Sequence, residues 1–187
     1  MNSQMLELGT RAPTFSLPDA DGNIHSLADA GDADALLVMF ISNHCPFVKL
    51  VADELAAVGR DYADRGVAVF AINSNDVERY PADAPEAMKR ESKDRGYGFP
   101  YLLDESQQVA KDYRAACTPD FYLFDRSQAL VYRGQLDGSR PGNGVAVTGA
   151  DLRQAIDAVL SGAEVAADQR PSMGCSIKWR PGNEPEY

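Results

Sequence analysis

The sequence has no apolar stretch long enough to cross a membrane. Its longest apolar run, residues 35–41, has the length of a buried strand, whereas a membrane helix needs about 20 such residues. Residues 1–7 contain neither the basic segment nor the apolar segment of a secretory signal. We therefore expect a cytoplasmic protein.

Positive charge is also scarce. The 187 residues include 18 Lys and Arg against 28 Asp and Glu, which gives a formal net charge of −10. This balance disfavours nucleic acids and anionic membranes as partners. The hydrophobic fraction of 44% and the charged fraction of 25% are those of an ordinary soluble domain.

Cysteine is rare, and the three cysteines form no recognisable cofactor motif. Their odd number argues against a framework of structural disulfides. The sequence contains no P-loop, no dinucleotide fingerprint and no Cys-x-x-Cys pattern, so we expect no cofactor and no metal. A zinc site from the cysteines and His44 is chemically conceivable, but scattered single cysteines make it the weaker alternative. Redox chemistry is the favoured role.

Segments typical of strands and helices alternate along the chain. Strand-like runs occur at 35–41, 67–73, 99–103, 121–125 and 129–133, and helix-like segments at 46–64, 85–95 and 148–162. Asp21-Gly22 marks the turn of an N-terminal hairpin over 13–27. Thr148, with Asp151 three residues later, resembles a capping box at the start of the last helix.

This order of elements predicts an α/β fold with a mixed central sheet flanked by helices. We expect residues 1–162 to form the domain. Residues 163–187 are rich in proline, glycine and polar side chains and read as an extended C-terminal tail. The tail either packs on the domain or swings over it.

Cys45 is the most informative residue of the chain. It directly precedes Pro46, which fits the first turn of a helix because its missing N–H would be unpaired there anyway. The sulfur of Cys45 is therefore expected at a helix N-terminus, where the helix dipole and free N–H groups favour a thiolate. This placement favours a nucleophilic, redox-active cysteine over a buried one that acts as a small apolar residue.

Three segments resemble one family. They are Asn43-His44-Cys45-Pro46-Phe47-Val48, Cys117-Thr118-Pro119-Asp120-Phe121-Tyr122 and Gly174-Cys175-Ser176-Ile177-Lys178-Trp179. With them, essentially the whole chain resembles the redoxin branch of the thioredoxin fold, which includes alkyl hydroperoxide reductases and thiol-specific antioxidants. Within this branch it is most similar to a peroxiredoxin-like group of thioredoxin family proteins. The resemblance implies an enzyme that acts on protein or small-molecule thiols and disulfides, or on peroxides.

The resemblance leaves two chemistries open. Thioredoxins begin the active helix with Cys-x-x-Cys, and here Cys45 matches the first cysteine while Val48 stands at the second. Peroxiredoxins have a proline and a Thr or Ser, seven and three residues before the cysteine, and an arginine on a neighbouring strand. Ser42 matches one of these positions, but Val38 and Pro119 occupy the other two. We favour a thiol–disulfide oxidoreductase over a thiol-dependent peroxidase, because peroxide chemistry would lack its electrostatic support.

An alternative from another class is a redox-sensing or metal-binding module without turnover.

The resemblance also implies which residues surround Cys45. It implies a cis peptide bond before Pro119 and places the backbone of Thr118 opposite the nucleophile, where an extended substrate could pair with it. Asn43 and His44 would line the same site. His44 either helps Cys45 to ionise or is a solvated turn residue.

A single attacking thiol needs a second thiol to complete the exchange. The candidates are Cys175, in the tail, and Cys117, next to Thr118. Alternation along an extended segment points the side chain of Cys117 away from that of Thr118, whereas a tail has freedom to move. We therefore favour Cys175 slightly. Each of the two could instead be a passive buried residue.

Two polar segments have weaker claims to function. Residues 73–76 end a strand at the side where ligands of α/β proteins gather, but they equally suit a turn. Arg133, Asp137 and Arg140 surround a glycine-rich loop. That loop could bind an anion, but solvated side chains are the favoured interpretation.

Overall fold

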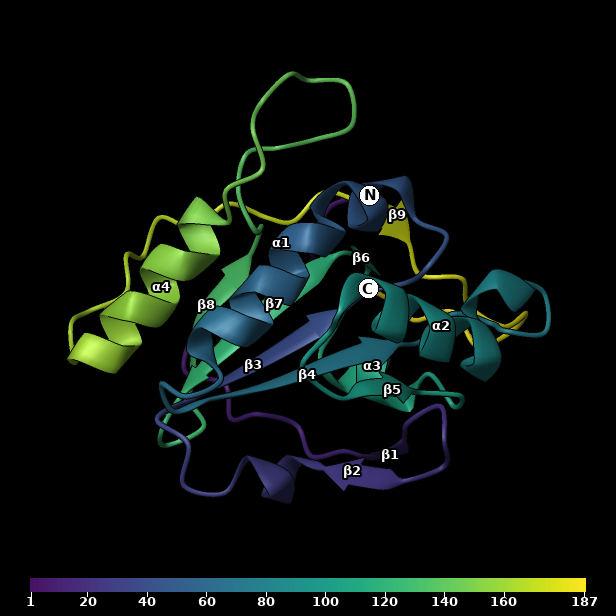
Figure 1. The fold of residues 1–187 in the computed structure, drawn as a ribbon, viewed down its shortest axis with the longest axis horizontal. Coiled ribbons are helices and arrows are strands. Elements are labelled where there is room, and N and C mark those ends of the chain that lie inside the picture. The colour runs from purple at the N-terminus through teal and green to yellow at the C-terminus, as the bar shows by residue number, and fades with distance from the viewer.

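A five-stranded sheet forms the centre of the protein, and the structure, a computed structural model, describes all residues 1–187 (Figure 1). The strand order is β5-β4-β3-β7-β8, in which β3, β4 and β5 are parallel and β7 and β8 antiparallel to their neighbours. The strands are β3 (Ala35–Phe40), β4 (Val67–Asn73), β5 (Tyr101–Leu103), β7 (Asp120–Asp125) and β8 (Leu130–Gly134). The predicted mixed α/β sheet is confirmed.

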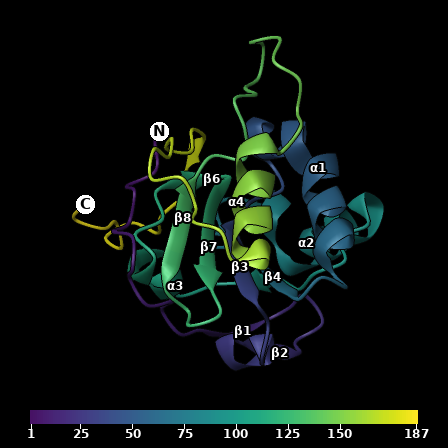
Figure 2. The same ribbon diagram turned by 90° about the vertical axis from the view of Figure 1, so that its left-hand side faces the viewer.

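Helices cover both faces of this sheet (Figure 2). They are α1 (Pro46–Tyr62), α2 (Pro85–Arg95), α3 (Gln108–Asp112) and α4 (Ala150–Ser161), with short 3₁₀ turns η1 (Leu27–Ala30) and η2 (Pro81–Asp83). Helices α1, α2 and α4 pack on one face, whereas α3 and the N-terminal hairpin of β1 (Ser16–Pro18) and β2 (Ile24–Ser26) pack on the other. None of these helices combines the length and the apolar character needed to span a bilayer.

Strand β3 is buried on both faces, which explains why its sequence is apolar throughout. Successive side chains of a strand point to opposite faces, and here both faces are covered. Leu37 and Met39 belong to the core under α1 and α4, while Val38 and Phe40 belong to the core under α3 and the hairpin. A central strand with this much burial positions the residues that follow it, and those residues include Cys45.

The C-terminal tail packs on the domain predicted for residues 1–162. It runs back along α4 to the N-terminal end of α1, where β9 (Cys175–Ser176) pairs antiparallel with β6 (Cys117–Thr118) (Figure 1). The side chain of Ile177 is buried in the core on the α3 side of the sheet. The tail is thereby brought to the same end of the sheet as Cys45.

The predicted capping box of α4 is wrong. The N-cap is Gly149, with φ of 64°, and not Thr148, whose hydroxyl accepts the N–H of Ala150 at 3.3 Å. The backbone N–H groups of Thr148 and Gly149 each donate to the carboxylate of Asp137 at 2.7 Å, and Asp151 accepts a hydrogen bond from Gln135 at 2.6 Å. A buried carboxylate from another segment therefore binds the amides that a local side chain was expected to cap.

Candidate active site

Cys45 lies where β3 leads into α1. It is the N-cap residue of α1 and Pro46 is the first helical residue, so its predicted position at a helix N-terminus is confirmed. The side chain is completely buried, and Sγ donates a hydrogen bond to the backbone oxygen of Thr118 at 3.2 Å. Cys45 thus stands at the positive end of the dipole of α1.

The segment opposite Cys45 has the backbone that the resemblance implied. The Thr118–Pro119 peptide bond is cis. Thr118 is buried, and its hydroxyl lies 3.4 Å from that of Ser42. The side chain of Thr118 therefore contacts the end of β3, while its carbonyl contacts the thiol of Cys45.

Cys175 approaches Cys45 from the tail. In the β6–β9 pair, Cys175 stands directly opposite Thr118, the residue that binds the thiol of Cys45. Burial, first, and then the neighbouring Cys45 thiol raise the pKa of Cys175 to about 11. The structure thus brings the thiols of Cys45 and Cys175 together, with Cys175 only partly buried.

Cys117, one residue before Thr118, faces a different environment. Its side chain is completely buried, and Sγ lies 3.9 Å from the backbone oxygens of both Ser172 and Pro119. Burial, and then the negative charge of Asp120, raise the pKa of Cys117 far above its usual value. A thiolate at Cys117 is therefore strongly disfavoured.

A buried carboxylate, which the sequence did not reveal, holds the turn before Cys45. Asp83 has no exposed surface; it accepts a hydrogen bond from the backbone N–H of Asn43 at 2.7 Å and lies 2.5 Å from Nδ1 of His44. The His44 ring also stacks on Tyr80, with centroids 5.4 Å apart. The interpretation of His44 as a solvated turn residue is therefore wrong, and Asn43 and His44 both have fixed orientations. No sequence signal connects Asp83 with this turn.

Residues 73–76 connect the same carboxylate to the tail. The side-chain amide of Asn75 donates to Asp83 at 2.8 Å, and its oxygen accepts the backbone N–H of Lys178 at 2.8 Å. The N–H of Asp76 donates to the backbone oxygen of Lys178 at 2.8 Å. This segment forms a turn, as one of the two interpretations expected, and it also anchors the residues after β9.

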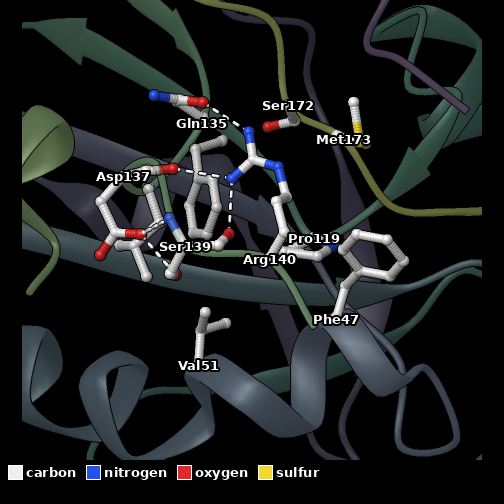
Figure 3. A pocket seen from close by; sticks show the side chains of 11 residues that line it. Phe47, Val51, Pro119, Gln135, Asp137, Ser139, Arg140, Ser172 and Met173 are labelled. Carbon is white, nitrogen blue, oxygen red and sulfur yellow. Dashed lines mark hydrogen bonds between the residues drawn. The ribbon is translucent and has the colours of Figure 1, made fainter. Parts of the chain in front are cut away.

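A small recess lies beside Pro119, as Figure 3 shows. Arg140 points across it and donates hydrogen bonds to the side chain of Gln135 at 2.5 Å and to the backbone oxygens of Asp137 and Ser139 at 2.8 and 2.6 Å. Asp137 is buried. The expectation of solvated side chains in this loop is therefore wrong for Asp137, because the carboxylate organises the loop from inside.

The chain shows no cluster of three His, Cys, Asp or Glu side chains that could hold a metal ion. The zinc alternative therefore has no ligand set, since zinc needs at least three protein ligands in one place.

Comparisons with known proteins agree with this architecture. A protein of Mycobacterium tuberculosis named "Putative peroxiredoxin Rv2521" is 30% identical over 101 residues, which are 54% of this chain and 59% of that protein. The match therefore spans less than two thirds of that relative. A solved structure described as "a hypothetical protein SMc02350 from Sinorhizobium meliloti 1021" is 58% identical, with a TM-score of 0.96 over 97% of this chain and 99% of that one.

More distant structures share the fold. The one described as "a putative Thiol:disulfide interchange protein DsbE from Chlorobium tepidum" is 22% identical, with a TM-score of 0.65 over 83% of this chain and 99% of that one. At this identity the likeness concerns the fold alone, and it confirms the predicted thioredoxin-like fold. The model of the AhpC/TSA family matches residues 8–133, more than half of the chain. The protein therefore belongs to the AhpC/TSA family, as its resemblance to the redoxins predicted.

Proposed function

We propose that this protein is a thiol–disulfide oxidoreductase in which Cys45 is the attacking thiolate and Cys175 the resolving thiol. Its family supports a thioredoxin-like redox function. One observation carries the finer proposal: Cys45 and Cys175 meet at the backbone of Thr118, which binds the first thiol and stands opposite the second in the β6–β9 pair.

The proposed reaction has two exchange steps. The Cys45 thiolate attacks one sulfur of a substrate disulfide, and the other substrate sulfur leaves as a thiolate that takes up a proton. The Cys175 thiolate then attacks the Cys45 sulfur, which forms a Cys45–Cys175 disulfide and releases the second substrate thiol. The substrate gains two electrons and the cysteine pair loses two. An external dithiol returns the pair to the reduced state.

The environment of Cys175 suits the second step. Part of the rise in its pKa comes from the neighbouring Cys45 thiol. Once Cys45 is bound in a mixed disulfide, this contribution is lost, and Cys175 ionises more readily when its thiolate is needed. Burial comes first for Cys117 too, but the charge of Asp120 comes next and Cys45 contributes less than either, so the loss of the Cys45 contribution leaves the Cys117 thiolate strongly disfavoured.

The test combines turnover with mapping of the thiols. We expect reduction of a small disulfide by an external dithiol to be catalysed by the unmodified protein and to fall to background in Cys45→Ser. Peptide mapping of the oxidised protein should then show a Cys45–Cys175 bond. Turnover that survives in Cys45→Ser would exclude Cys45 as the nucleophile, and a Cys45–Cys117 bond would transfer the resolving role.

A thiol-dependent peroxidase is the second candidate, favoured by the family and by the relative named a peroxiredoxin. Here Cys45 would attack hydrogen peroxide to give a sulfenic acid and hydroxide, and Cys175 would then form the same disulfide and release water. The proline and arginine of the peroxiredoxin pattern are absent at Val38 and Pro119. A rate of Cys45 oxidation by peroxide no faster than that of a free thiol would exclude this candidate.

A further inference from the structure

The strand β9 and its flanking residues, 172–177, are called the covering strand below. We infer that the covering strand occupies the place of an extended substrate, so that the intact protein reacts with small disulfides or peroxides and excludes polypeptide disulfides. This inference rests on the proposed role of Cys45 and specifies the substrate class of that site.

The covering strand uses the backbone groups that a polypeptide substrate would need. Extended peptides bind sheet edges through main-chain hydrogen bonds, and the edge nearest to Cys45 is β6. Here Cys175 pairs with Thr118 and Ser176 pairs with Cys117, and the N–H of Ile177 donates to the backbone oxygen of Ala116 at 3.1 Å. The edge is therefore already paired along its length by the chain itself.

The contact is so close that it depends on a glycine. A Cβ atom placed on Gly174 would lie 1.9 Å from the backbone oxygen of Thr118, far inside van der Waals contact. A second close approach occurs upstream, where a Cβ on Gly134 would lie 2.0 Å from the backbone oxygen of Arg170. At these two points the tail and the domain lie backbone against backbone, a fit that only glycine permits.

Contacts on both sides of Cys175 hold the covering strand in place. Ser172 is buried and donates its hydroxyl proton to the backbone oxygen of Gly134 at 2.5 Å, and Ile177 is buried in the core. On the outer side, Asn2 forms a β-bridge with Met173, and the N–H of Ser3 donates to the backbone oxygen of Ser172 at 2.9 Å. An incoming polypeptide would have to break all of these contacts.

A small reagent has less to displace. Cys45 is completely buried, whereas Cys175 is partly exposed. The recess beside Pro119 is bordered by Ser172 and Met173 of the covering strand and by Phe47, two residues after Cys45. Met173, which is 44% exposed, stands at the rim of this recess. A local shift of Met173 and Cys175 would admit a small molecule to Cys45, but an extended peptide needs the whole of β6.

The test compares two disulfides that carry the same activated leaving group, one small and one on an extended peptide. The protein carries Cys117→Ser and Cys175→Ser, so that Cys45 is its only thiol, and the rate of Cys45 modification is measured for each reagent. We expect the small disulfide to react at least tenfold faster. Adding Gly174→Ala should wedge the covering strand off β6 and raise the rate with the peptide at least tenfold.

Gly98→Ala is the matched control, because a Cβ at Gly98 meets nothing within 4 Å; it should leave both rates unchanged. Ile177→Ala, which removes only a buried anchor, gives a second way to loosen the strand if Gly174→Ala does not fold. Equal rates with both reagents before loosening, or no gain with the peptide afterwards, would overturn the inference and leave the role of Cys45 intact. Failure of Cys45 to react with either reagent in any variant would overturn the proposed function itself.

Discussion

Cys175 and Cys117 lie on paired strands, yet a difference of one residue in register gives them opposite surroundings. Cys175 stands opposite Thr118 and contacts Cys45, while Cys117 stands opposite Ser176 and faces away from the site. Side chains alternate between the two faces of a strand, so adjacent positions on a pair of strands cannot share a face. The face of the strand on which a cysteine lies, and not its nearness to Thr118 in the sequence, therefore determines whether its sulfur reaches Cys45.

The strongest test of this comparison removes each cysteine in turn. In Cys175→Ser, the mixed disulfide on Cys45 loses its resolving thiol, so turnover of a small disulfide should fall by at least tenfold and the adduct should accumulate. Mass spectrometry of the protein quenched during turnover measures the adduct. Cys117→Ser is the matched control, since it replaces a neighbouring buried sulfur; it should keep turnover within about twofold. Adduct accumulation in Cys117→Ser alone would reverse the comparison.

A second test supplies a resolving thiol from α1 instead of from the tail. Val48 is buried one helical turn after Cys45, and residues three apart on a helix are neighbours. Adding Val48→Cys to Cys175→Ser should therefore restore turnover several-fold, because an intramolecular thiol is already near the mixed disulfide. Val48→Ala in the same background is the control that should restore nothing. Equal turnover in the two variants would show that resolution does not limit the cycle.

A third test removes hydrogen bonds that hold the turn before Cys45 and leaves the strand pairing of the tail unchanged. Asp83→Ala removes the buried acceptor shared by Asn43, His44 and Asn75. Leaving buried donors without a partner costs about 1–3 kcal/mol of unfolding free energy each, so we expect a loss of roughly 3 kcal/mol in urea unfolding. Asp76→Ala, which removes a carboxylate that accepts only local backbone bonds, should cost less. A loss below 1 kcal/mol in Asp83→Ala would show that water replaces the carboxylate.

The parts of the site that local sequence determines could be predicted. The apolar run of β3 and the Cys45–Pro46 pair place the thiol at the start of α1 through short-range preferences alone. The partners that come from distant segments could not. Asp83 reaches His44 across 39 positions, and no periodicity or capping pattern encodes such a contact. The buried role of Asp137 was missed for the same reason, because a carboxylate beside glycines is locally typical of a solvated turn.

The smallest expected effect concerns Asp120, a buried carboxyl near Cys117 but not near Cys175. It should make the stability of the protein depend on pH. Asp120 has no exposed surface, and burial raises its pKa to about 7, although hydrogen bonds from Tyr122 and others oppose the rise. The ordinary pKa of the carboxyl is 3.8, so the folded protein binds this proton more tightly than the unfolded chain. Its contribution to stability is therefore complete below about pH 4 and is lost as pH rises through about 7.

Asp120→Asn keeps the size of the side chain and one of its two acceptor oxygens but removes the titration. Between about pH 4 and 7, the free energy of unfolding of the unmodified protein should fall relative to that of Asp120→Asn, by at most about 1.4 kcal/mol per pH unit, the limit for one proton. Denaturant unfolding of both proteins across this range measures the difference. If their free energies run parallel with pH, the carboxyl titrates alike in both states, and the environment around Cys117 is less apolar than its burial indicates. If they diverge, burial of Asp120 penalises its ionised form in the folded protein, as expected for a carboxyl with no exposed surface.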